Sequence, residues 1–297
     1  MATTSRLGHQ DIRIGTIARI GDGADYIRQI LPHGFECFQL FAWQHLPPVD
    51  MGEYAKQVND VIGDLAIVSS IGMFGNPLQD EQTVKDWETS IKSCKLFGCN
   101  IVAGFAGALE DRSVPDNLAK FTEVWTPLVK LAEDEGVKIA FENCDMGGTW
   151  NRPSWNIAHA PASWEMIFNA ISSDHLGLEW EPCHQMNSLI DPLPQLKKWI
   201  KKVYHVHGKD ATVFWDVIKE KGIRGGEQFV YHRTPGFGDT NWTDVISILR
   251  QNGYTGCIDI EGWHDPVYKD DLEMTGQVFS MNYLKQCRGG TFIPNPK

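Results

Sequence analysis

Residues 116–143, DNLAKFTEVWTPLVKLAEDEGVKIAFEN, contain the unit that predicts the whole fold. Apolar side chains recur at helical spacing over residues 116–135, Gly136 follows as a helix stop, and residues 137–143 form a short apolar run typical of a buried strand. The same alternation of strand and helix occurs eight times along the chain. Eight consecutive βα units predict a (β/α)₈ TIM barrel of the α/β class.

The alternation runs through residues 1–297 without a break in composition, so we predict a single domain. Strands are expected at 12–20, 35–40, 66–74, 100–107, 137–143, 176–180, 203–207 and 257–261. Helices are expected at 25–31, 50–65, 81–97, 116–135, 161–171, 192–202, 244–252 and 272–286. Loop insertions are expected near 145–160 and 212–232, where either could cover a site. A doubly wound sheet is the rival fold, but its glycine-rich turn after the first strand is missing.

The composition indicates a globular enzyme, with 42% hydrophobic and 22% charged residues in 297. A net charge of −11 argues against nucleic acid as the partner, because phosphate binding depends on basic surfaces. No apolar stretch is long enough to cross a bilayer, and the first residues show no signal-peptide pattern. The seven cysteines include no C-x-x-C pair, which is typical of reduced thiols. We therefore expect a cytoplasmic location and no membrane partner.

Polar side chains stand at the C-terminal ends of the last four predicted strands. They are Glu142, Glu181, His207 and Glu261. Active-site residues of a barrel lie at these strand ends, and consecutive strands are neighbours, so the four side chains should converge. Three carboxylates cannot lie together unpaired, and a divalent cation would resolve this. Carboxylates with an imidazole suit Mn²⁺, Mg²⁺ or Co²⁺, although zinc could also bind.

The alternation of side chains along a strand leaves two further residues open. Glu179 shares a strand face with Glu181, and His205 shares one with His207. Both would lie one layer deeper in the barrel, where they could support the ligands above them.

Five motifs in residues 130–290 resemble the sugar isomerase/epimerase family with a xylose isomerase-like barrel. They are Phe141-Glu142-Asn143-Cys144, Leu178-Glu179-Trp180-Glu181-Pro182-Cys183-His184, His205-Val206-His207-Gly208-Lys209-Asp210, Arg233-Thr234-Pro235-Gly236-Phe237-Gly238-Asp239-Thr240-Asn241-Trp242 and Ile258-Asp259-Ile260-Glu261. As a set, these motifs are specific for the family but not for a substrate.

The resemblance implies one divalent metal, often Mn²⁺, held by the four residues already identified. It also implies that Glu142 and Glu261 are catalytic, one removing a proton next to a carbonyl and the other returning it, through an enediolate. His184 and Arg233 match positions that contact substrate oxygens, whereas Lys209 and Asp210 are expected to hold a loop.

The sequence departs from the family pattern in two places. Glu181 replaces an aspartate, which lengthens that ligand by one methylene. Glu261 is followed by Gly262-Trp263-His264-Asp265, where relatives often carry another acidic pair. We expect His264 to be a rim residue, with a role as an extra acid or base as the alternative.

Aromatic side chains are numerous, with eleven tryptophans, and some could stack on a sugar ring. Trp43 and His45 follow the second predicted strand and are candidate substrate contacts. No cluster of arginine and lysine suggests a phosphate, so a free ketose, a cyclic polyol ketone or an oxidised glycoside fits better.

Two reactions with the same first step remain open. One is isomerisation or epimerisation. The other is a lyase reaction in which β-elimination follows, as in the dehydratases and the catalytic subunit of 3-oxo-C-glycoside deglycosidases that the chain resembles. A homo-oligomer or a complex with a small partner subunit is expected on the same grounds. The family also has an endonuclease branch, which would need further histidines on strands two to four. Ser69, Ser70 and Ala103 stand there instead, so the sequence argues against a nuclease.

Overall fold

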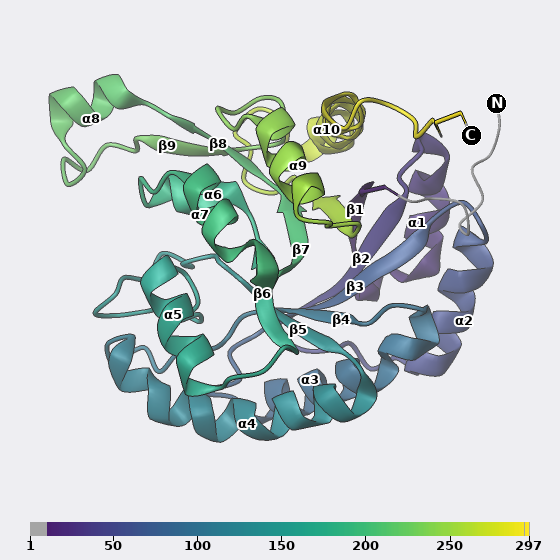
Figure 1. The fold of residues 1–297 in the computed structure, drawn as a ribbon, viewed down its shortest axis with the longest axis horizontal. Helices are drawn as coiled ribbons and strands as arrows, with labels where there is room; N and C mark the ends of the chain where they lie inside the picture. Colours follow the sequence, from purple (N-terminus) through teal and green to yellow (C-terminus); the bar gives the residue numbers. More distant parts are fainter. Residues whose placement is uncertain (1–10, 294, 297) are drawn as a thin grey trace.

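The computed structural model describes residues 11–293, 295 and 296 (Figure 1). The strands are β1 (Arg13–Arg19), β2 (Cys37–Trp43), β3 (Ile67–Phe74), β4 (Ile101–Gly104), β5 (Lys138–Glu142), β6 (Leu176–Trp180), β7 (Val203–Gly208), β8 (Asp210–Val213), β9 (Val230–Arg233) and β10 (Cys257–Ile260). The helices are α1 (Gly23–Ile30), α2 (Met51–Ile62), α3 (Glu81–Ser93), α4 (Leu118–Glu135), α5 (Pro161–Ala170), α6 (Pro182–Asn187), α7 (Pro192–Trp199), α8 (Trp215–Lys221), α9 (Trp242–Gln251) and α10 (Glu273–Cys287). Short 3₁₀ turns are Ile20–Asp22, Leu31–His33, Cys94–Phe97, Pro115–Asn117, Ile200–Lys202 and Asp270–Leu272.

Eight of the strands close into a parallel barrel in the order β1-β10-β7-β6-β5-β4-β3-β2, and helices surround it (Figure 1). This confirms the predicted TIM barrel, with β10 as the eighth strand. Local signals set the helix ends. Asp50 and Asp80 cap α2 and α3 by accepting hydrogen bonds from backbone N–H groups of the first turn. Gly136 ends α4 in the left-handed conformation, at φ 67°.

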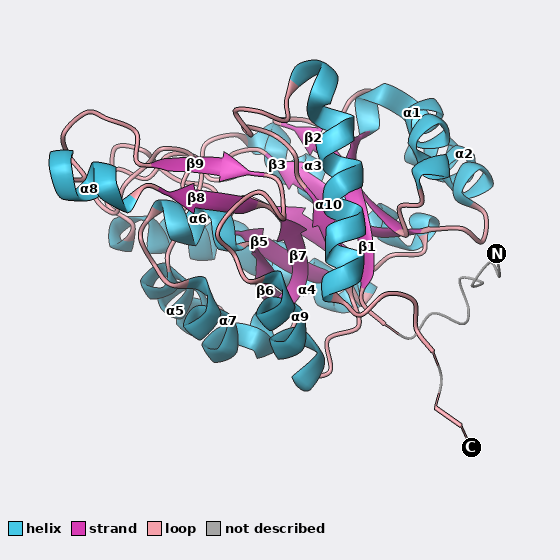
Figure 2. Cartoon of the chain, turned by 90° about the horizontal axis from the view of Figure 1, so that it is seen from above, coloured by secondary structure: helices cyan, strands magenta, loops and turns pink. Residues whose placement is uncertain are grey.

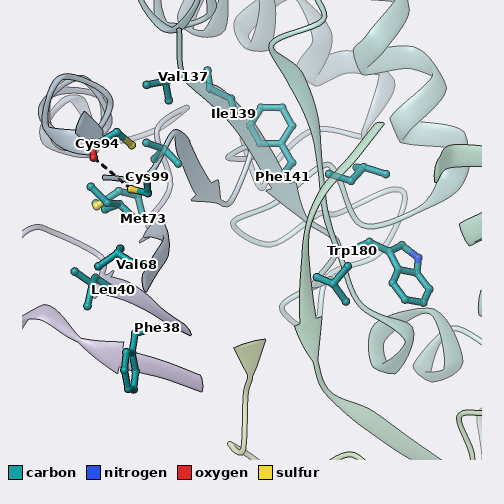
Figure 3. Close-up of a cluster of buried hydrophobic side chains, with 14 of the residues drawn as sticks. Phe38, Leu40, Val68, Met73, Cys94, Cys99, Val137, Ile139, Phe141 and Trp180 are labelled. Carbon is teal, nitrogen blue, oxygen red and sulfur yellow. Dashed lines mark hydrogen bonds between the residues drawn. The ribbon is translucent and has the colours of Figure 1, made fainter. Parts of the chain in front are cut away.

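The main apolar core fills the layer between the barrel and its helices. Figure 3 shows part of it, with buried side chains from β2, β3, β5 and β6. Trp125 of α4 packs edge-to-face on Trp87 of α3 and Phe141 of β5, with ring centroids 4.8 and 4.5 Å apart. Its indole N–H donates to the carbonyl of Ala106 at 2.8 Å, so this large side chain is buried without an unpaired donor.

The expected insertion at 212–232 is a structured arm and not a loop. β8 and β9 pair antiparallel, from Asp210 opposite Arg233 to Val213 opposite Val230, and α8 lies between them in the chain. Figure 2 shows this arm projecting on the side of the barrel opposite α1 and α2. Pairing satisfies the backbone groups of the arm as it leaves the barrel.

The insertion at 145–160 has no helix or strand within the described residues. Asn156, which is fully buried, holds it. The Asn156 amide donates to the carbonyls of Glu142 at 2.8 Å and Cys144 at 2.7 Å, and its oxygen accepts from the N–H of Ala106 at 3.1 Å. The loop is therefore tied to the end of β5 and to the segment after β4.

Helix α6, which begins directly after Glu181, was not predicted, because six residues are too few for a periodic pattern. Among the described helices, none combines the length and the apolar character that a membrane span requires.

Candidate metal centre

The four predicted ligands lie at one end of four neighbouring strands. Glu142 is the last residue of β5, Glu181 follows β6, His207 lies in β7 and Glu261 follows β10. One ligand atom from each lies within 4.8 Å of the others. Each residue is no more than 8% exposed. The barrel closure thus brings together side chains that are up to 119 positions apart in the sequence, between Glu142 and Glu261.

The ring of His207 is held at both nitrogens. Its Nδ1 lies 3.3 Å from Oε1 of Glu142 and 3.3 Å from Oε2 of Glu261. Its Nε2 lies 2.8 Å from Oε1 of Gln39 on β2. Nε2 also lies 3.2 Å from Oε1 of Glu179, so His207 presents Nδ1 to Glu142 and Glu261 and Nε2 to Gln39 and Glu179 in the barrel interior.

Buried carboxylate oxygens without partners mark this place as suited to a cation. Among the described residues, neither oxygen of Glu181 has a hydrogen-bond partner, although Oε1 lies 2.7 Å from Nε2 of His184. Oε2 of Glu261 also has none. A buried carboxylate is costly unless a positive charge compensates it, and divalent cations bind carboxylate and imidazole groups. The longer side chain at position 181 still places its oxygen in the group.

The two predicted catalytic carboxylates differ electrostatically. Burial raises the pKa of Glu142 to about 7, against the opposing effect of His207. Burial acts in the same direction on Glu261, but Lys209 and His207 outweigh it and hold the pKa of Glu261 well below its usual range. Nζ of Lys209 lies 2.6 Å from Oε1 of Glu261. Glu142 can therefore exchange a proton near neutral pH, while Glu261 stays ionised.

Glu179 and His205 lie beneath the four ligands. His205 Nδ1 is 2.8 Å from Oε1 of Glu179, and His205 Nε2 is 2.7 Å from Oδ2 of Asp259 on β10. Burial disfavours the charged imidazole, but the hydrogen bonds to Asp259 and Glu179 outweigh it and raise the pKa of His205 to about 9. Burial likewise opposes ionisation of Glu179, yet His207 and His205 lower its pKa to about 2. These residues contact the ligand His207 and not the open cavity.

A cavity of about 730 Å³ opens above the four-residue group. Its polar lining includes Glu142, His207, Glu261, Lys209, Asp145, Gln228 and Arg19. Its apolar lining comes largely from the ends of β1 to β4 and includes Ile17, Phe41, Trp43, Phe74 and Phe105. The cavity thus has a charged side and an aromatic side. Arg19 and the phenylalanines were not predicted, although their position at the ends of the first four strands is the signal that could have found them.

Two of the four predicted substrate contacts lie in this cavity. Trp43 lines it and stacks on Trp155, with ring centroids 5.6 Å apart, and His184 also lines it. The other two, His45 and Arg233, are not among the lining residues. His45 Nδ1 lies 3.3 Å from Asp86, and the Arg233 guanidinium pairs with Asp265 at 3.2 Å.

Three histidines form a row along the cavity wall. Ring centroids of His184 and His232 are 5.0 Å apart, and those of His232 and His264 are 5.8 Å apart. Burial lowers the pKa of all three, that of His232 to about 4, so the row is neutral at pH 7. His232, on β9 of the arm, was not predicted. Gln228, which precedes β9, also lines the cavity. The arm therefore contributes two side chains to the site.

The two residues after β7 have separate roles. Lys209 is buried and contacts the carboxylate of Glu261, as described above. Asp210 accepts hydrogen bonds from the N–H of Thr240 at 3.0 Å and from the indole of Trp242 at 3.0 Å. Asp210 thus holds the loop before α9, as expected, while Lys209 contacts Glu261 of the candidate metal centre.

Comparison with known proteins agrees with the observed fold. Residues 27–285 match the family described as xylose isomerase-like TIM barrel. An inosose dehydratase from Clostridium beijerinckii is 27% identical over 169 residues, which cover 54% of this chain and 52% of the relative. The chain thus spans about half the length of the curated relatives that it matches.

Solved structures show the same fold along nearly the whole chain. A 3-keto-D-glucoside 4-epimerase from E. coli has a TM-score of 0.68 at 15% identity, covering 93% of this chain and 100% of that one. The IOLI protein, whose crystal structure contains a zinc atom, has a TM-score of 0.65 at 17% identity, covering 93% and 96%. At these identities the likeness shows the fold alone.

Proposed function

Because the chain belongs to the xylose isomerase-like TIM barrel family, we propose that it is a divalent-metal-dependent isomerase or epimerase of a carbohydrate ketone. The reaction begins with removal of a proton from the carbon next to the carbonyl. The observation that carries the proposal is the pair Glu142 and Glu261, which each lie 3.3 Å from His207 Nδ1 and line the same aromatic-walled cavity.

The proposed ligands are Glu142, Glu181, His207 and Glu261, and the proposed ion is Mn²⁺, with Mg²⁺ and Co²⁺ as alternatives. Three carboxylates and one imidazole suit these ions. The zinc atom in the IOLI structure supports a divalent metal in this fold without deciding its identity. When bound, the cation supplies positive charge that stabilises the negative charge developing on the carbonyl oxygen.

Glu142 is the proposed base. A general base works best when its pKa lies near the working pH, and in the metal-free chain burial raises the pKa of Glu142 to about 7. Glu261 is the proposed partner on the other side of the substrate. Lys209 holds the Glu261 carboxylate at 2.6 Å and so fixes its position.

The remaining cavity residues would bind the sugar. Neutral His184 and His232 can each donate one hydrogen bond and accept another, which matches the two capacities of a sugar hydroxyl. Trp43 and Trp155 offer an aromatic surface for the apolar face of a ring. The contact that we predicted for Arg233 would require this side chain to leave Asp265.

A lyase is the second candidate, favoured by the size of the cavity. A volume of about 730 Å³ falls in the range that holds drug-sized ligands, larger than one sugar ring. The same proton removal would then be followed by β-elimination of water or of an aglycone resting on the aromatic wall. The similarity to an inosose dehydratase supports this alternative. The alternative also includes the reaction of the catalytic subunit of 3-oxo-C-glycoside deglycosidases.

Proton exchange followed by NMR tests both candidates. The chain, stripped of metal and resupplied with Mg²⁺, is incubated in D₂O with free ketoses and with 3-oxo-glucosides. Metal-dependent deuterium uptake with a new isomer supports the first candidate, and loss of the proton with release of water or an aglycone supports the second. Absence of exchange with every ketone would refute both. The Glu142→Gln variant tests the proposed base in the same assay. Its matched control is Glu165→Gln, the same change on the exposed face of α5.

We also propose a cytoplasmic location. None of the seven cysteines forms a disulfide in the described part of the chain, and six are buried. A homo-oligomer or a complex with a small partner subunit stays a prediction.

A further inference from the structure

A layer of polar side chains fills the barrel beneath the proposed metal ligands. It comprises Gln39, Ser70, Glu179, His205 and Asp259, and every one of them is fully buried. Barrel interiors are normally filled by branched apolar side chains. Buried polar groups are costly without partners, so the geometry of this layer must be set by its internal hydrogen bonds.

The layer is anchored across three neighbouring strands. Asp259 of β10 accepts from Ser69 Oγ at 2.5 Å and contacts His205 of β7, which in turn contacts Glu179 of β6. Gly15 of β1 makes room for this series of hydrogen bonds, because a Cβ at that position would collide with Asp259 Oδ1. Glu179 Oε1 is therefore a fixed hydrogen-bond acceptor.

Gln39 connects this acceptor to the ligand His207. Its amide nitrogen donates to Glu179 Oε1 at 2.5 Å and to Ser70 Oγ at 2.9 Å, while its amide oxygen lies 2.8 Å from His207 Nε2. A carboxylate only accepts hydrogen bonds, so the nitrogen end of the amide must face Glu179. The oxygen end then faces His207, and Nε2 must carry the hydrogen of this bond. The lone pair is left on Nδ1, the nitrogen that faces Glu142 and Glu261.

We infer that Gln39 is a positioning residue for the metal centre: held by Glu179, it fixes the hydrogen of His207 on Nε2 and reserves Nδ1 for the cation. This inference rests on the proposed metal site. The reverse orientation of the amide would oppose the N–H of Gln39 to Nε2, put the ring hydrogen on Nδ1 and point it into the ligand group. Glu179 Oε1 itself lies 3.2 Å from His207 Nε2 and, as an acceptor, acts in the same direction as the oxygen of Gln39.

Two variants change that direction in different ways. Gln39→Met keeps the length and the apolar volume but removes the acceptor. Glu179→Gln keeps the shape but can donate to Gln39, which frees the amide to turn over. Loss of a partner that orients a metal ligand typically costs about 10- to 100-fold in affinity, and we expect this loss in both variants. Ser70→Ala is the matched control, because it removes a bond of the same amide nitrogen without changing which end faces Glu179.

The experiment measures zinc binding and the position of the ring hydrogen in the full-length chain. Zn²⁺ is titrated by calorimetry, and ¹⁵N-histidine NMR of the zinc-loaded chain reports which nitrogen of His207 carries hydrogen. We expect hydrogen on Nε2 in wild type, weaker binding in Gln39→Met and Glu179→Gln, and near wild-type binding in Ser70→Ala. Circular dichroism checks folding, and if Gln39→Met unfolds, the isosteric Glu179→Gln tests Gln39 and Glu179 together, because Glu179 also contacts His207 Nε2 at 3.2 Å.

The outcomes separate this inference from the proposed function. A wild-type chain that binds no Zn²⁺ would overturn both. Zinc binding by the folded variants as tight as in wild type, or hydrogen on Nδ1 of His207 in the loaded chain, would overturn the role of Gln39 alone.

Discussion

Replacing Glu181 by glutamine should have opposite effects on the metal-free and metal-loaded chain. Both oxygens of Glu181 are fully buried, and neither has a hydrogen-bond partner among the described residues, although Oε1 lies 2.7 Å from Nε2 of the neutral His184. Leaving a buried group unsatisfied costs about 1–3 kcal/mol, and more when it is charged. The glutamine amide also lacks partners but is neutral. We therefore expect the metal-free variant to be more stable than wild type by about 2 kcal/mol.

The cation reverses this order, because binding to the folded state alone adds stability. At a metal concentration 100 times Kd the gain is about 2.7 kcal/mol. With an unfolding entropy of about 2.1 cal/mol/K per residue, a chain of 297 residues would then melt about 4 °C higher. Glu181→Gln should lose most of this shift, because it removes one of four ligands.

Thermal and urea unfolding with and without Mn²⁺ measure both effects. The exposed Glu165→Gln is the matched control and should behave as wild type does under both conditions. A metal-free Glu181→Gln chain less stable than wild type by about 1 kcal/mol or more would show that the carboxylate has a structural partner. A full metal-dependent shift in the variant would show that Glu181 is not a ligand.

Three further outcomes follow from named contacts. Glu142→Gln should slow α-proton exchange by about 10²–10⁴-fold while the chain stays folded by circular dichroism, and retention of exchange would assign the base elsewhere. Glu36→Gln should destabilise the chain by about 3 kcal/mol in urea unfolding, because it unpairs Arg288, which contacts Glu36 at 2.6 Å and is 4% exposed. Burial opposes ionisation of Glu36, but Arg288 outweighs it and lowers the pKa of Glu36 from 4.5. The stabilisation is therefore present above pH 4.5 and is lost as the pH falls through the folded pKa. The stability difference between wild type and Glu36→Gln should shrink in that range, and a constant difference would contradict the assignment. Trp43→Ala should raise KM for a 3-oxo-glycoside with an aromatic aglycone by roughly tenfold and leave a free ketose little changed, whereas equal effects would remove the aromatic wall from aglycone binding.

The sequence predicted the barrel and the convergence of the four proposed metal ligands because both follow from local patterns. An apolar run that ends in a charged residue, as at Phe141-Glu142 and Ile260-Glu261, is visible without knowing which strands pair. Closure in chain order then makes consecutive strand ends neighbours. Glu142, Glu181, His207 and Glu261 converge for this reason.

Other features depend on contacts that no local pattern contains. The arm of β8 and β9 is stabilised by pairing between residues some 20 positions apart, and its stretch between 214 and 229 has no barrel-strand pattern. The predicted contact of His45 rested on its place after a strand and that of Arg233 on the family resemblance, but aspartates nearby in space pair with both side chains. Gln39 carried no signal, because a glutamine within an apolar run gives no indication of what it will face.

The sequence by itself determined which side chains reach the mouth of the barrel, because strand period and strand order are written in the spacing of apolar residues. Only the tertiary structure decided the pKa of each of those side chains, and with it which of them can take up a proton. Glu142 and Glu261 are the same residue type at equivalent strand ends, yet burial raises the pKa of one while Lys209 holds the pKa of the other low. Charge interactions depend on distance and on exclusion of water, and both are set by packing across the whole barrel.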